Sequence, residues 1–181
     1  MSPQGDIVGL NTSQMKEMQK TLILGFGNPD RGDDGVAWYI LSKIANHFNK
    51  SLSEEQIECC MVELNDAIHL WFNMQLIPEI SEQLANYQHA IFVDAHTVDV
   101  KEDISAIDLK PEFQNSPFTH HLTPSSCLSL TQSIFGKYPE AKLISVKGYS
   151  FEFNNQLSQK TCALADQVVE IILHLLELKP K

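Results

Sequence analysis

The alternation of apolar and polar positions along this 181-residue chain predicts strands and helices in turn. Residues 21–25 form an apolar run typical of a buried strand, and residues 34–48 carry apolar side chains at helical spacing. Further strands are expected at 57–64, 90–93, 103–109 and 141–146, and further helices at 77–87, 125–135 and 158–178. Strands that alternate with helices are typical of α/β folds with a parallel sheet.

The ends of the predicted helices and the first residues of the chain complete this outline. Asp33 is expected either to cap the first helix or to be an acid of its first turn. Ser125 or Ser126 is expected to cap the third helix, and Ser158 the last. Residues 1–20 are polar and predicted to be a loose extension. Residues 21–181 contain no repeat or linker, so they are expected to form a single α/β domain.

The charge and the cysteines narrow the classes of partner and of compartment. The chain has 13 basic and 23 acidic residues and a net charge of -10, which argues against nucleic acid and anionic membranes. Its apolar runs are far shorter than the roughly 20 residues that cross a bilayer, so no membrane insertion is expected. Four cysteines without a CxxC spacing, and no leader pattern, predict reduced thiols in a cytoplasmic protein.

A glycine-rich loop connects the first strand to the first helix in "LILGFGNPDRGDDGV". A dinucleotide fingerprint needs a third glycine where Asp30 stands, and no Walker motif follows, so the pattern does not favour a phosphate site. Asp33 and Asp34 would also repel a phosphate at this position. From spacing alone, Asp34 is equally a solvated acid of the first turn or a ligand.

Two more polar features follow the predicted strands. Asp94 comes directly after the apolar run 90–93, and a later loop contains His120 and His121. Ligands of open α/β sheets lie beyond the carboxyl ends of the strands, so these side chains are expected to converge with the glycine-rich loop. Two carboxylates and an imidazole suit a borderline divalent cation, although the histidine pair does not show which member would bind.

Four separated motifs then occur in one order: "GFGNPDRGDDGV", "QLIPEISEQLANYQHAIFVDA", "THHL" and "FEFNNQLSQKT". In this respect the chain resembles the maturation endopeptidases of nickel-iron hydrogenases, over about residues 22–176. The resemblance implies a three-layer α/β sandwich of the phosphorylase/hydrolase-like kind, with a twisted, mostly parallel sheet flanked by helices. It also implies an endopeptidase that removes the C-terminal extension of a nickel-loaded large-subunit precursor.

Matched residue by residue, the resemblance implies a metal-binding set of Asp34, Asp94 and His120, with His121 as the alternative histidine. Asp34 and Asp94 would also be the catalytic acids, and the metal, nickel, would arrive with the substrate or bind directly as a divalent ion. Either the nickel or one of the two acids would activate water. Asp33 would orient the loop or supply another carboxylate.

The chain departs from the family pattern in three ways. Many members have glutamate where Asp34 stands, and the helix after the acids often has a glycine where this chain has Ala37. Residues 1–20 have no counterpart in the pattern. Two other functions stay open on the sequence: a noncatalytic factor that binds nickel or the precursor, and, less favoured, a nucleotide-binding α/β module.

Overall fold

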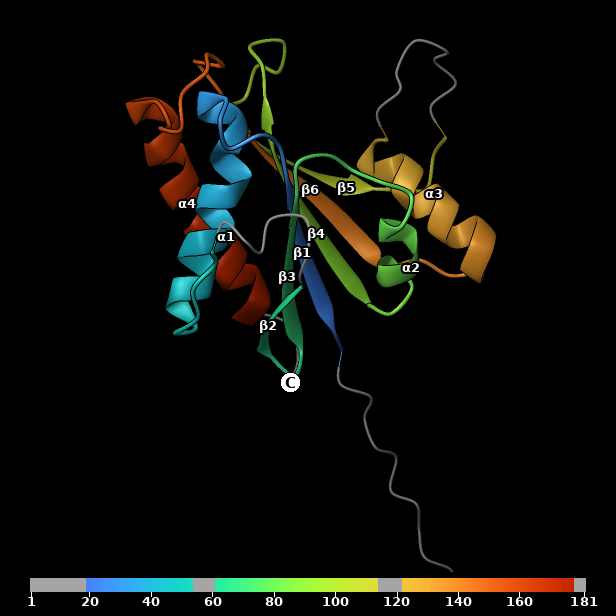
Figure 1. The fold of residues 1–181 in the computed structure, drawn as a ribbon. Helices are drawn as coiled ribbons and strands as arrows, with labels where there is room; N and C mark the ends of the chain where they lie inside the picture. The colour runs from blue at the N-terminus through green and yellow to red at the C-terminus, as the bar shows by residue number, and fades with distance from the viewer. Residues whose placement is uncertain (1–18, 54–60, 114–121, 178–181) are drawn as a thin grey trace, which may run out of the picture.

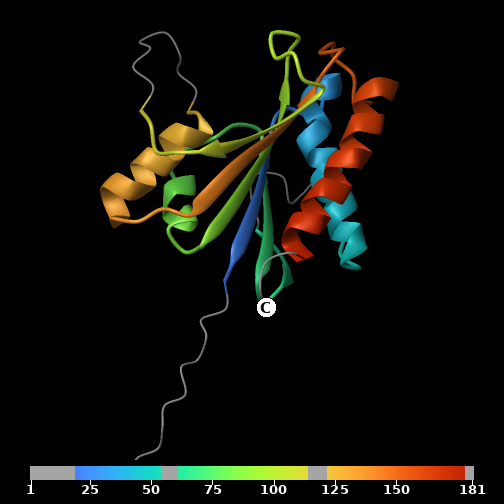
Figure 2. The same ribbon diagram turned by 180° about the vertical axis from the view of Figure 1, so that it is seen from behind.

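The computed structural model describes residues 19–53, 61–113 and 122–177, which contain one six-stranded sheet in the order β2-β3-β1-β4-β6-β5. Figure 1 shows this sheet in the middle of the molecule, with α1 and α4 on one face and α2 and α3 on the other, and Figure 2 shows the same layers from behind. The expected three-layer α/β sandwich is therefore confirmed. The strands are β1 (Thr21–Phe26), β2 (Val62–Asn65), β3 (Ile68–Asn73), β4 (His89–His96), β5 (Ile104–Leu109) and β6 (Glu140–Lys147), and the helices are the 3-10 turn η1 (Gly32–Gly35), α1 (Val36–His47), α2 (Ile80–Leu84), α3 (Pro124–Phe135) and α4 (Gln159–Glu177).

The parallel part of the sheet is its centre. Strand β1 pairs in parallel with β3 on one side and β4 on the other, and β4 pairs in parallel with β6. Only the edge strands β2 and β5 are antiparallel, so the mostly parallel sheet is confirmed. The apolar run in β1 is buried on both faces: Ile23 packs toward α1 and α4, whereas Leu22 and Leu24 pack toward α2 and α3.

Strand β3 was not among the predicted elements. It returns antiparallel to β2 through a turn in which Oδ1 of Asn65 accepts hydrogen bonds from the backbone N–H groups of Ala67 and Ile68. Its apolar side chains face both layers, because Leu70 and Phe72 contact the α1–α4 core and Trp71 packs on the opposite core. This sequence lacks the simple alternation of apolar and polar residues that predicts a half-buried strand. The turn residue Asn65 was the local feature from which a second strand could have been predicted.

Several boundaries and caps differ from the sequence prediction. The side chain of Thr123, rather than Ser125 or Ser126, caps α3 by accepting a hydrogen bond from the Ser126 N–H, and Pro124 occupies the first turn. The predicted cap of α4 is confirmed, because Oγ of Ser158 accepts a hydrogen bond from the N–H of Thr161. Strand β2 (Val62–Asn65) overlaps the strand expected at 57–64, of which residues 57–60 lie outside the described residues, and α2 is shorter than the helix expected at 77–87.

Two further sequence expectations meet the structure only in part. Most of the expected loose extension, residues 1–18, lies outside the described residues. Cys59 and Cys60 also lie outside them. Cys127 and Cys162 are both free thiols, as expected. Among the helices of the described ranges, none combines the length and apolar character that a membrane span requires.

Candidate functional site

Asp34 and Asp94 line one cavity of about 530 Å³ at the carboxyl end of the central strands. Asp34 comes from η1, directly after the glycine-rich loop, and Asp94 comes from β4 two residues before that strand ends. The expected convergence of these two acids is confirmed. His120 and His121 lie outside the described residues, and Leu122, the next residue described, lines the same cavity.

The glycine-rich loop holds the Asp34 carboxylate by a hydrogen bond from its own backbone. Oδ2 of Asp34 accepts a hydrogen bond of 3.0 Å from the N–H of Asn28, and Oδ1 of Asn28 accepts one of 2.9 Å from the N–H of Asp30. The loop thereby points an amide at a carboxylate of its own chain instead of at a phosphate, which is consistent with the missing third glycine. The Asp34 carboxylate is consequently fixed at the rim of the cavity.

Gly27 makes this loop conformation possible. Its φ angle is 132°, which side chains rarely adopt, and an added Cβ would overlap the carbonyl oxygen of Asp34. We expect Gly27→Ala to destabilise the fold by about 1–3 kcal/mol and to displace Asp34. Thermal unfolding measures the loss of stability. Gly136→Ala is the matched control, because Gly136 also has positive φ, at 69°, but an added Cβ there meets nothing within 4 Å. Equal loss of stability in both variants would contradict this role of Gly27.

Asp94 is a buried acid in a strongly perturbed environment. Burial raises the pKa of Asp94 to about 7, and the negative charge of Asp34 adds to that rise, while the hydrogen bond of 2.7 Å from the Ala95 N–H opposes it. Within the described residues neither acid takes part in an ion pair, although Arg31 lines the same cavity. The two carboxylates can therefore accept a proton or a cation.

Asp33 is not the expected helix cap, and its side chain is not in the cavity. The carboxylate is 0% exposed and accepts hydrogen bonds from the backbone N–H groups of Tyr149, Ser150 and Ser158 and from Oγ of Ser158. Burial alone would raise its pKa, but these hydrogen bonds outweigh burial and hold the pKa of Asp33 below its usual value. Of the two predictions for Asp33, the helix cap was wrong, because the carboxylate accepts hydrogen bonds from a segment more than 100 residues away. The alternative prediction is confirmed, since Asp33 is an acid of the first turn of η1.

The segment 148–158 is joined to the glycine-rich loop by hydrogen bonds. Besides the bonds to the Asp33 side chain, the Gly32 N–H donates to the carbonyl of Asn154, the Asp33 N–H to the carbonyl of Ser150, and the Asn154 N–H to the carbonyl of Asp30. We call these contacts, together with the Asp33 side chain, the Asp33 latch. Apart from the cap at Ser158, local patterns in segment 148–158 predict no structural role for it, because contacts between residues so distant along the chain leave no local pattern in the sequence.

No group of three histidine, cysteine, aspartate or glutamate side chains suited to a metal occurs in the described ranges. Two of the three expected ligands, Asp34 and Asp94, lie together, and the third lies outside those ranges. Oxygen ligands and an uncompensated negative charge fit a divalent cation. The donor set present is consequently compatible with metal binding but is incomplete in the described residues.

The fold and the site together define a class of protein: a three-layer α/β domain with two acids at the carboxyl edge of a central parallel sheet. No family model and no curated protein matches the sequence. Solved structures do match. The hydrogenase maturating endopeptidase HybD from E. coli aligns with a TM-score of 0.64 and 20% identity, over 88% of this chain and 93% of that one.

Two archaeal structures give the same result. The NiFe hydrogenase maturation protease HycI from Thermococcus kodakarensis aligns with a TM-score of 0.59 and 21% identity, over 90% of this chain and 95% of that one. The hydrogenase 2 maturation peptidase from a Thaumarchaeota archaeon aligns with a TM-score of 0.57 and 20% identity, over 89% of this chain and 100% of that one. The structural neighbours are thus hydrogenase maturation proteases, and this chain has their fold.

Proposed function

We propose that this chain is an endopeptidase that removes the C-terminal extension from the nickel-loaded large-subunit precursor of a nickel-iron hydrogenase. The observation that carries the proposal is the meeting of Asp34 and Asp94 in one cavity, in a fold shared with hydrogenase maturation endopeptidases. The four sequence motifs that resemble this family include both acids. The reaction would take place in the cytoplasm.

In this proposal nickel is part of the substrate, and the two acids recognise it. Asp34 and Asp94 would contribute oxygen ligands to the nickel of the precursor, with His120, or alternatively His121, as the nitrogen ligand. Nickel in this place would supply Lewis acidity, polarising the scissile carbonyl or lowering the pKa of a water molecule. Recognition of the metal would restrict cleavage to precursors that have received it.

Asp94 is the residue best suited to move a proton. Burial and the charge of Asp34 raise its pKa to about 7, close to the value at which a general base combines availability with basicity. Asp34, held by the Asn28 amide, would keep its position while a proton passes from water to Asp94 and then to the leaving amine. Where a carboxylate, and not the nickel, activates the water, we assign Asp94 as general base and then general acid, and Asp34 as the fixed carboxylate.

The proposal predicts cleavage that depends on nickel. Wild-type protein incubated with nickel-loaded precursor is expected to release the C-terminal peptide, and nickel-free precursor is expected to stay intact; mass spectrometry of the products measures both. The double variant Asp34→Ala/Asp94→Ala should cleave neither. Cleavage that is indifferent to nickel, or that survives in the double variant, would refute metal recognition by these acids.

The same assay separates the noncatalytic alternative. A factor that only holds nickel or the precursor would bind the loaded precursor, for example in co-sedimentation, without shortening it. Binding without cleavage by the wild-type protein would therefore replace the endopeptidase proposal with that alternative.

A further inference from the structure

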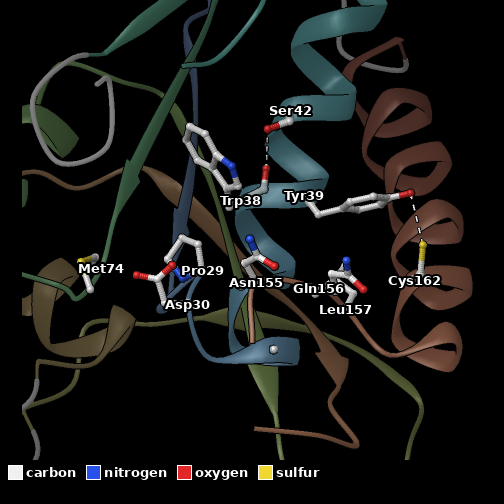
Figure 3. Close-up of a pocket in the computed structure, with 12 residues that line it drawn as sticks. Pro29, Asp30, Trp38, Tyr39, Ser42, Met74, Asn155, Gln156, Leu157 and Cys162 are labelled. Atoms are coloured by element: carbon white, nitrogen blue, oxygen red, sulfur yellow. Dashed lines mark hydrogen bonds between the residues drawn. The ribbon is translucent and has the colours of Figure 1, made fainter. Parts of the chain in front are cut away.

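A second cavity, of about 650 Å³, is lined by residues of the glycine-rich loop other than those that line the cavity of Asp34 and Asp94. Figure 3 shows its walls: Trp38, Tyr39 and Ser42 from α1, Cys162 from α4, the loop residues Pro29 and Asp30, and the segment 155–157. We call this cavity the α1–α4 groove. Its volume lies within the roughly 300–1,000 Å³ typical of ligand sites, and the function proposed above leaves it without a role.

The groove adjoins the cavity of the two acids. Met74 lines both, and the glycine-rich loop forms a shared wall: Asn28, Arg31 and Asp34 line the acid cavity, whereas Pro29, Asp30 and Gly32 line the groove. Met74 therefore marks the place where the two cavities meet. A ligand of the acid cavity that is longer than the cavity itself can extend past Met74 toward the groove.

The lining of the groove suits a peptide. Asn155 and Gln156 are exposed, and their carboxamides can both donate to and accept from a peptide backbone. The indole of Trp38 packs edge-on against Phe72 and also lines the groove, where it offers an apolar surface to a side chain. Among the described residues no lysine, arginine or histidine lines the groove and Asp30 does, so a phosphate ligand is disfavoured.

We propose that the α1–α4 groove binds the C-terminal extension of the precursor, in extended form, while the scissile bond lies beside Asp34 and Asp94. This inference rests on the function proposed above and adds the recognition site for the segment that is removed. The groove is walled by a loop and two helices, and we expect it to take a single extended chain. The extension is the part of the substrate that ends freely and can enter as a single chain.

The proposal predicts a selective effect of filling the groove. Gln156→Trp places a large side chain on an exposed groove position and is expected to raise the KM for nickel-loaded precursor at least about tenfold, with kcat nearly unchanged, because the acids are untouched. Gln159→Trp is the matched control: it makes the same exchange at an exposed position three residues further on that does not line the groove. Its kinetics should equal those of the wild type.

A precursor whose extension is shortened to a few residues tests whether the extension is the segment that binds in the groove. It should be cleaved by the wild type with a raised KM, and Gln156→Trp should add little to that increase. A synthetic peptide with the extension sequence should inhibit the wild type competitively and Gln156→Trp about tenfold more weakly.

A Gln156→Trp variant that matches the wild type, or that impairs both precursors equally, would overturn the groove assignment while leaving the endopeptidase intact. Absence of cleavage by the wild type would instead overturn the proposed function, and this inference with it.

Discussion

Replacing Asp94 with asparagine is expected to lower kcat/KM for nickel-loaded precursor by about 10²- to 10⁴-fold, the range associated with loss of a general base. The substitution keeps an oxygen that can accept the hydrogen bond from the Ala95 N–H, so the strand should stay in place. Steady-state cleavage of the precursor measures the effect. Glu102→Gln, the same chemical change at an exposed position after β4, is the matched control and should behave as the wild type.

The pH dependence provides an independent check on this role. Because burial raises the pKa of Asp94 to about 7, wild-type kcat/KM should fall as the pH decreases through 7, where the base becomes protonated. In metal-free buffer the raised pKa also affects the free energy of unfolding. Because the folded protein favours the protonated acid, stability declines as the pH rises from about 4 through 7. Asp94→Asn should thus unfold at a higher temperature than the wild type at pH 8. An inactive variant that is also less stable at pH 8 would point to misfolding instead of loss of the base.

Replacing Asp33 with alanine is expected to lower the free energy of unfolding by about 3–5 kcal/mol. The carboxylate is fully buried, and its removal leaves the N–H groups of Tyr149, Ser150 and Ser158 without their acceptor. Denaturant unfolding measures the loss. Asp30→Ala is the matched control, because Asp30 is an exposed acid of the same loop, and its loss should change stability by less than about 0.5 kcal/mol.

The contribution of Asp33 also has a defined pH dependence. Its pKa in the folded protein is lowered, so the stabilisation is fully present above the ordinary aspartate pKa of about 3.9 and is lost as the pH falls through the folded value. The difference in stability between the wild type and Asp33→Ala should hence be constant near neutral pH and shrink in acid. A difference that stays constant down to pH 2 would contradict a charged role for the Asp33 latch.

Much of the fold follows from local patterns in the sequence. The apolar runs predicted β1, β4 and β6, and helical spacing predicted α1, α3 and α4, because burial against a sheet imposes those periods. Strand β3 escaped prediction because it is buried on both faces and follows a short turn. The caps at Asp33 and at Ser125 or Ser126 were misassigned because several side chains near each helix start can accept a hydrogen bond, and only the backbone path selects one.

Some residues of the candidate site could likewise be predicted from local patterns, and others could not. The positions of Asp34 and Asp94 after apolar strands predicted that they would meet, since parallel neighbouring strands bring their carboxyl ends to one edge. The roles of Met74, Asn155 and Gln156 could not be predicted, because each lines its cavity from a segment distant in sequence from the acids. The same holds for the hydrogen bonds that segment 148–158 makes to Asp33.

The sequence by itself determined the layered α/β architecture, the glycine-rich loop and the pair of acids at the sheet edge, because each depends on periodicity or on residues next to one another. Only the tertiary structure decided that two adjacent aspartates separate in function: Asp33 is buried and bonded to segment 148–158, while Asp34 faces the cavity of Asp94. It also decided that a groove adjoins that cavity. The physical reason is that burial, pKa and cavity shape depend on residues brought together from distant parts of the chain, and local patterns do not contain that information.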